Sequence, residues 1–132
     1  MSSLHVKCVC GSPMNVNAGD IILNGKYRWY VSYYCKDCER ASEIDGYGID
    51  NLPKEVESLI IKQHGEWRIF SNNKSTQLKI KYMLRKMSIF DKISFLDNEY
   101  QTIVSGSENE IKWIQCKLED KKVTDYEVQK VN

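Results

Sequence analysis

The sequence places four cysteines in two close pairs, Cys8-Val9-Cys10-Gly11 and Cys35-Lys36-Asp37-Cys38. Four thiolates grouped two and two can close a tetrahedral zinc site. The second pair has the common C-x-x-C spacing, whereas the first is a tighter C-x-C followed by a glycine that suits the tight turn of a zinc knuckle. The pattern predicts one structural zinc ion held by Cys8, Cys10, Cys35 and Cys38, with no open position for metal chemistry.

Two alternatives for these cysteines are a thioredoxin-like redox motif and structural disulfides. A redox C-x-x-C opens a helix, and no helical pattern follows Cys38. The N-terminus lacks a charged-then-apolar signal segment, and no apolar run is long enough to span a membrane. We therefore expect a cytoplasmic protein with reduced thiols, and we rank zinc above redox chemistry and redox chemistry above disulfides.

The other histidines and cysteines have simpler interpretations. His5 is close enough in sequence to replace one cysteine ligand, although such a residue more often lies near the site without binding the metal. His64 falls in the last turn of a predicted helix, where a cation suits the helix dipole. Cys116 lies in a helical pattern beside Trp113 with no histidine nearby, so we expect a buried, unreactive thiol.

Turn signals predict an antiparallel hairpin between the two cysteine pairs. Asn24-Gly25 favours a two-residue turn between strands at 20–23 and 26–34, and the second strand leads into Cys35. A third strand at 41–44 is expected to end at an Asp45-Gly46 turn. We expect the hairpin aromatics to cover this small sheet rather than to stack on bases. The prediction is a zinc ribbon at 1–50.

Apolar periodicity predicts helices in the rest of the chain. A helix after Pro53 would bury Val56, Leu59 and Ile60 and end at Gly65, so that residues 51–66 link the ribbon to a second unit at 67–132. The predicted order of elements in this unit is strand, helix, helix, strand, helix, strand. Its strands are expected at 67–70, 100–104 and 123–131. The predicted fold class is therefore α+β, a four-cysteine ribbon followed by a small α/β unit of order βααβαβ.

The helices of the second unit are predicted from apolar stripes and caps. The first helix, at 75–87, carries an apolar stripe of Ile80, Met83, Leu84 and Met87. Ser88 stops this pattern and can cap a short second helix that turns Ile89, Ile93 and Leu96 inward. Ser107 and Glu110 have the spacing of a capping box at the start of the last helix, whose apolar positions are Ile111, Ile114 and Leu118.

Charge is nearly balanced overall but unevenly distributed. The formal net charge is +1, which gives no global electrostatic case for binding nucleic acid. One acid-rich run contains Glu39, Glu43, Asp45, Asp50, Glu55 and Glu57. A base-rich run contains Lys74, Lys79, Lys81, Arg85, Lys86 and Lys92. Such runs are most often solvated faces, and they are also where a charged partner would dock.

Two resemblances extend this interpretation. Residues 78–85, 103–107, 110–117 and 122–128 resemble the C-terminal domain of the bacterial ribosomal stalk protein in pattern and order. The stalk protein's glycine-rich turn is not matched at 86–92, so the resemblance implies the fold and not translation-factor binding. The whole arrangement, including Gly65-Glu66-Trp67, is similar to zinc-ribbon immunity proteins encoded beside bacterial polymorphic toxins.

The function expected from the sequence is binding rather than catalysis. The chain contains no H-E-x-x-H, P-loop or dinucleotide fingerprint, so we expect neither an enzyme nor a small-molecule substrate. The resemblance implies a bacterial immunity protein that binds and neutralises a toxin, and we assign the acid-rich run as its contact surface. The alternative is a nucleic-acid-binding or ribosome-associated adaptor that contacts phosphates through the hairpin aromatics, Arg28 and the base-rich helical segment at 79–86. No membrane partner is expected.

Overall fold

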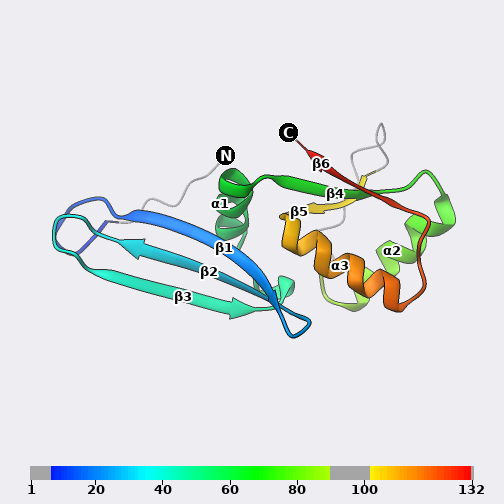
Figure 1. The fold of residues 1–132 in the computed structure, drawn as a ribbon, viewed down its shortest axis with the longest axis horizontal. Helices are drawn as coiled ribbons and strands as arrows, with labels where there is room; N and C mark the ends of the chain where they lie inside the picture. The colour runs from blue at the N-terminus through cyan, green and yellow to red at the C-terminus, as the bar shows by residue number, and fades with distance from the viewer. Residues whose placement is uncertain (1–6, 90–101, 132) are drawn as a thin grey trace. The chain divides into compact units, whose positions relative to one another are not determined.

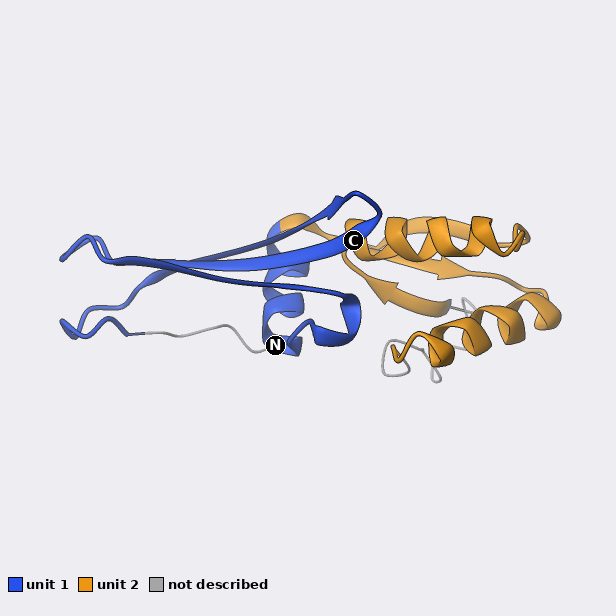
Figure 2. Ribbon diagram, turned by 90° about the horizontal axis from the view of Figure 1, so that it is seen from below, with its two compact units in different colours: residues 1–63 blue, residues 64–132 orange. Residues whose placement is uncertain are grey.

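The computed structural model describes residues 7–89 and 102–131, which form a mixed α and β structure (Figure 1). The chain divides into two compact units, Met1–Gln63 and His64–Asn132, coloured blue and orange in Figure 2. Each unit contains one small antiparallel sheet. No helix in the described ranges combines the length and apolar character needed to cross a lipid bilayer.

The sheet of the first unit consists of β1 (Asn15–Leu23), β2 (Lys26–Tyr34) and β3 (Ala41–Tyr47), in the order β1-β2-β3. The predicted turn between β1 and β2 is confirmed: Asn24 and Gly25 have φ angles of 50° and 77°, as a tight hairpin turn requires. β1 begins at Asn15, well before the predicted start at residue 20.

The predicted end of the third strand is wrong. β3 continues through Asp45 and Gly46 to Tyr47, and Gly46 pairs with Trp29 of β2. A Cβ atom at Gly46 would lie 2.5 Å from the Trp29 ring, so the indole rests directly on the glycine backbone. The glycine is needed here for a close approach across the sheet rather than for a turn.

The core of the first unit lies on one face of this sheet. Alternate residues of β2 are buried there: Tyr27, Trp29 and Val31 are 1%, 7% and 2% exposed. Helix α1 (Lys54–His64) contributes its buried apolar face, and Figure 2 shows the helix on one side of the sheet. A short 3-10 helix, η1 (Ile49–Asn51), precedes it. The expectation that hairpin aromatics cover the sheet is thus confirmed for Tyr27 and Trp29.

The outer edge of β1 is tied to α1 by a side-chain amide. Gln63 donates to the carbonyl oxygen of Val16 at 3.4 Å and accepts from the N–H of Ala18 at 3.3 Å. The amide therefore contacts the strand edge much as a neighbouring strand would, which protects backbone groups that an edge strand otherwise leaves open.

The sheet of the second unit has β4 (Glu66–Phe70) at its centre, between β5 (Thr102–Gly106) and β6 (Glu127–Val131). Helices α2 (Lys74–Lys86) and α3 (Glu108–Asp120) follow β4 and β5. The core contains fully buried residues from all of these layers: Ile69, Ile80, Leu84, Val104, Ile111, Ile114 and Leu118. β6 is shorter than the strand predicted at 123–131.

Local signals set the ends of both helices. The Asn73 side chain accepts from the N–H groups of Ser75 and Thr76, at 2.9 and 3.2 Å, and caps α2. The capping box of Ser107 and Glu110 is confirmed at the start of α3.

Ser88 ends α2, as predicted. It adopts a φ of 61°, and the next N–H, that of Ile89, bonds back to the Leu84 carbonyl at 3.0 Å. This is the Schellman arrangement that commonly closes a helix. The second helix expected after Ser88, with Ile93 and Leu96, lies outside the described residues.

Candidate metal centre

The two cysteine pairs occupy turns that are built alike. The N–H of Cys8 donates to the carbonyl of Ser12, and the N–H of Cys35 donates to the carbonyl of Arg40, each at 2.8 Å. In each turn the residue after the second cysteine has a positive φ, 92° at Gly11 and 62° at Glu39. The backbone of each turn therefore holds its two cysteines on one side. The sequence indicates this for the glycine turn but not for the turn at Glu39.

The four sulfur atoms meet in one cluster, which confirms the predicted grouping. Sγ of Cys8 lies 3.2 Å from Sγ of Cys38, and Sγ of Cys10 lies 3.6 Å from Sγ of Cys35. All four Sγ atoms lie within 4.8 Å of one another. The thiols are free, with separations well above the S–S bond length of about 2 Å. Together they could hold a metal ion.

Each turn supplies one buried and one exposed cysteine. Cys8 and Cys35 are buried, whereas Cys10 and Cys38 face solvent. The cluster is fixed between three strands of the sheet, since Cys35 follows β2 directly, Cys38 shortly precedes β3, and the first turn leads into β1. A bound ion would thus pin both ends of the hairpin at the same point.

The thiols of Cys10 and Cys38 differ in acidity because neighbouring thiols and desolvation act on them unequally, although a backbone N–H lowers the pKa of both. The backbone N–H of Ser12 and the neighbouring thiol of Cys35 lower the pKa of Cys10 to about 6. The N–H of Arg40 also lowers the pKa of Cys38, but hydrogen bonding with Cys8, desolvation and the remaining thiols outweigh it and raise that pKa to about 12. At neutral pH, protons therefore remain on part of the cluster, and a bound cation would displace them.

A side-chain bond joins the two turns outside the sulfur cluster. The Ser12 hydroxyl donates to the carboxylate of Asp37, which stands between Cys35 and Cys38. The sequence contains no signal for this contact, because it depends on how the two turns meet. Bonds that orient the residues around metal ligands commonly affect metal affinity.

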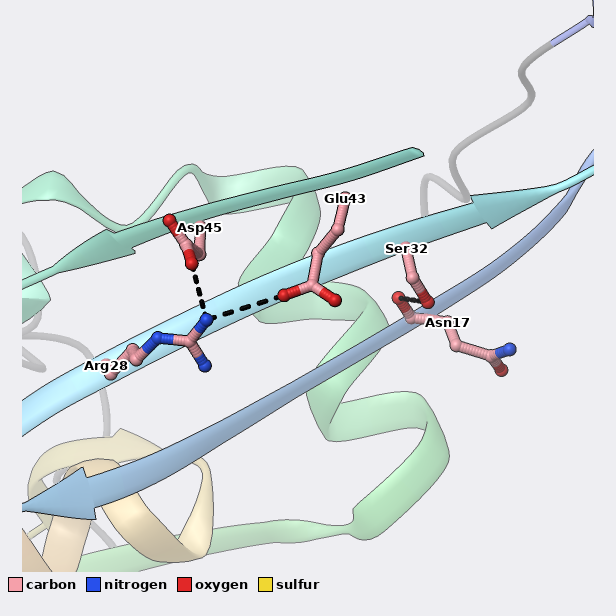
Figure 3. A network of polar contacts seen from close by, with 5 residues as sticks. All are labelled: Asn17, Arg28, Ser32, Glu43 and Asp45. Carbon is pink, nitrogen blue, oxygen red and sulfur yellow. Dashed lines mark hydrogen bonds and ion pairs between the residues drawn. The ribbon is translucent and has the colours of Figure 1, made fainter. Parts of the chain in front are cut away.

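The predicted contact acids are only partly brought together. Glu43 and Asp45 lie on the same face of β3, and both contact Arg28 of β2, Glu43 at 3.4 Å (Figure 3). Glu39 lies in the second cysteine turn. The remaining acids occupy η1 (Asp50) and the first turn of α1 (Glu55 and Glu57), where they also favour the helix dipole.

The contacts of Arg28 are those that the sequence patterns predict least well. The hydrogen bond to Asp45 is the main influence that raises the pKa of Arg28, with smaller contributions from Glu43. Its guanidinium lies 5.8 Å from the ring centre of Tyr30, and that ring rests on Gly19, where a Cβ atom would lie 2.3 Å from the phenol oxygen. The guanidinium is therefore engaged within the sheet, which disfavours the expected role of Arg28 as a phosphate contact.

The remaining cysteine and the histidines lie outside the sulfur cluster or outside the described residues. Cys116 is exposed on α3, so the expectation of a buried thiol is wrong. The reason is that Ile114 and Leu118 occupy the buried face of this helix, and Cys116, two positions from each, lies on the opposite face. His64 is the last residue of α1, as predicted, and His5 lies outside the described residues.

Comparisons with models of known protein families, with curated proteins and with solved structures find no match to this chain.

Proposed function

We propose that the cysteine cluster binds one zinc ion and that the chain is a non-catalytic immunity protein, which binds and neutralises a bacterial toxin. The zinc assignment rests on the donor set. A tetrahedral zinc–thiolate site has Zn–S bonds of about 2.3 Å, which places its sulfurs about 3.8 Å apart. The separations of 3.2 and 3.6 Å, within an overall limit of 4.8 Å, require only small adjustments to reach that geometry.

The observation that carries the proposed function is the exposed carboxylate pair on β3. Glu43 and Asp45 are 53% and 49% exposed and share a single guanidinium, so this cluster keeps a net negative charge. In Figure 3 they lie on the sheet face turned away from α1. Many antibacterial toxins act on nucleic acids and have basic clefts. A carboxylate pair on a stiff sheet can enter such a cleft and exclude substrate phosphates.

The metal cluster supports this role by limiting the freedom of β3. This strand lies at the edge of the sheet and pairs only with β2 among the described strands. Every residue of β3 is exposed, apart from the half-buried Gly46. A strand that is held close to its start by a metal site loses little conformational entropy when a partner binds, and this favours affinity.

A direct test is affinity capture of the protein from its native cell, with the neighbouring reading frame expressed alongside. We expect one stoichiometric protein partner. The variant Glu43→Lys/Asp45→Lys/Asp50→Lys should then weaken that partner's binding and reduce its dependence on salt. The control is Glu119→Lys/Glu127→Lys, which reverses the charge of two exposed acids of the second unit and is compared with the double variant Glu43→Lys/Asp45→Lys.

Two outcomes of this experiment test the β3 contact surface and the proposed function separately. If the partner is captured but the triple variant binds with unchanged affinity and salt dependence, the β3 surface has no part in the interaction. If the protein instead captures RNA in a salt-sensitive manner and no protein partner, the adaptor function replaces the immunity function.

A further inference from the structure

A groove with a volume of about 670 Å³ lies between α2 and α3 of the second unit. Its apolar lining includes the half-buried side chains of Met83, Met87 and Val123, here called the floor. The two methionines belong to the apolar stripe of α2, but they are only half-buried, while Ile80 and Leu84 of the same stripe are fully buried. The core therefore uses half of the stripe and leaves the methionines facing the groove.

The charged residues that line the groove, here called its rim, are mostly basic. Lys79 and Lys86 line it from α2, and Lys117 and Lys121 line it from the end of α3, with Asp120 as the acidic residue among them. α2 carries five basic residues and no acidic one. The groove thus combines an apolar floor with an excess of positive charge.

The helix dipole explains only part of this charge. Lys86, Lys117 and Lys121 lie in or just after the last turns of their helices, where a cation is favourable. Lys79 lies about two turns before the end of α2, where the dipole gives no such benefit. Lys86 lies 5.2 Å from the ring centre of Tyr82, which helps to hold its ammonium group at the rim.

We propose that this groove binds an acidic amphipathic helix of a protein partner. Met83 and Met87 are one helical turn apart, so they match a pair of apolar side chains with the same spacing on an incoming helix. Methionine side chains are flexible and adapt to apolar partners. Acidic residues flanking that pair would meet the lysine rim. Nucleic acid fits less well, because the Lys86 ammonium group already lies over the ring of Tyr82 and no other described aromatic side chain lines the groove for base stacking.

This site is separate from the proposed toxin-binding surface. It lies in the other unit and has the opposite charge, so it needs a second, acidic partner segment. Its test does not depend on whether the β3 surface binds a toxin.

The test uses three fluorescent probes of similar length with the full-length chain. The first is a glutamate-rich helical peptide with two leucines four positions apart, the second replaces both leucines by serine, and the third is oligothymidylate. We expect micromolar binding of the leucine peptide, at least about tenfold weaker binding of the serine peptide, and weaker binding of the oligonucleotide. Methyl NMR signals of Met83 and Met87 should shift with the leucine peptide.

Two charge-reversal variants test whether the leucine peptide binds in the groove. Lys79→Glu should weaken binding of the leucine peptide by about tenfold or more. The matched control is Lys74→Glu, which makes the same change on an exposed residue of the same helix outside the groove lining. Equal binding of the serine peptide, tighter binding of oligothymidylate, equal effects of the two variants, or no binding of the leucine peptide would each overturn the proposal.

Discussion

The Ser12 hydroxyl donates a hydrogen bond to the carboxylate of Asp37, and this bond joins the two turns that carry the clustered cysteines. Both residues are close to the proposed thiol ligands but are not themselves among the proposed ligands. The bond restrains the two turns relative to each other even before a metal binds. Replacing either side chain therefore changes how the two turns are held together without removing a cysteine.

The first prediction concerns this bond. Ser12→Ala and Asp37→Ala should each weaken zinc affinity, by up to about tenfold, because the turns lose a contact that holds the sulfurs together. A double-mutant cycle isolates the interaction, and competition with a chromophoric chelator measures it. Strictly additive effects of the two substitutions would show that the bond contributes nothing to metal binding.

The second prediction is that metal removal unfolds the sheet of the first unit and spares the second unit. A structural zinc site supplies folding free energy, so Cys35→Ser or chelation should abolish dispersed amide NMR signals from β1 to β3. Acidification should act in the same direction, because protons compete with the metal for the thiolates.

The second unit should keep its signals under the same conditions, since it buries a core of its own. Cys116→Ser is the matched control, because it removes an exposed thiol outside the cluster. Loss of signals from both units on chelation would contradict the independence of the second unit.

The third prediction tests the packing of α2. Leu84 is fully buried, so Leu84→Ala should lower the free energy of unfolding by about 2–5 kcal/mol. Leu78 lies on the same helix but is 68% exposed, and Leu78→Ala should have little effect. Denaturant unfolding of the second unit measures both. Similar values for the two substitutions would mean that the helix faces another way.

The fourth prediction tests the close approach of Trp29 to Gly46. Gly46→Ala should destabilise the first unit by about 1–3 kcal/mol, because the added methyl group overlaps the indole ring. Ser42→Ala, at an exposed position of the same strand, is the control. Tryptophan fluorescence during denaturation reports the difference. A neutral Gly46→Ala would place the indole elsewhere.

Features that depend on neighbours in sequence could be predicted from the sequence. The Asn24-Gly25 turn, the bounds of β2 and the capping box of Ser107 and Glu110 follow from local patterns. The cysteine cluster could also be predicted, because the cysteines come in two pairs that a hairpin brings together.

Features that depend on strand register, or on how much of a helix face packs against its neighbours, could not be predicted from the sequence. Asp45-Gly46 has the composition of a turn, and only the pairing with Trp29 shows why glycine belongs inside a strand. Periodicity places Met83 and Met87 on the apolar face of α2 but cannot show that neighbouring elements cover only part of that face. The pairing of Arg28 with two carboxylates likewise depends on strand register.

The central claim is that the four paired cysteines hold one zinc ion, and native mass spectrometry with thiol alkylation tests it most directly. We predict a mass corresponding to one zinc ion per chain, with alkylation of Cys116 alone until the protein is denatured with chelator, after which all five cysteines react. Iron in place of zinc would reveal itself by visible absorption and would correct the metal. A metal-free chain in which all five thiols react at once under native conditions would contradict the account.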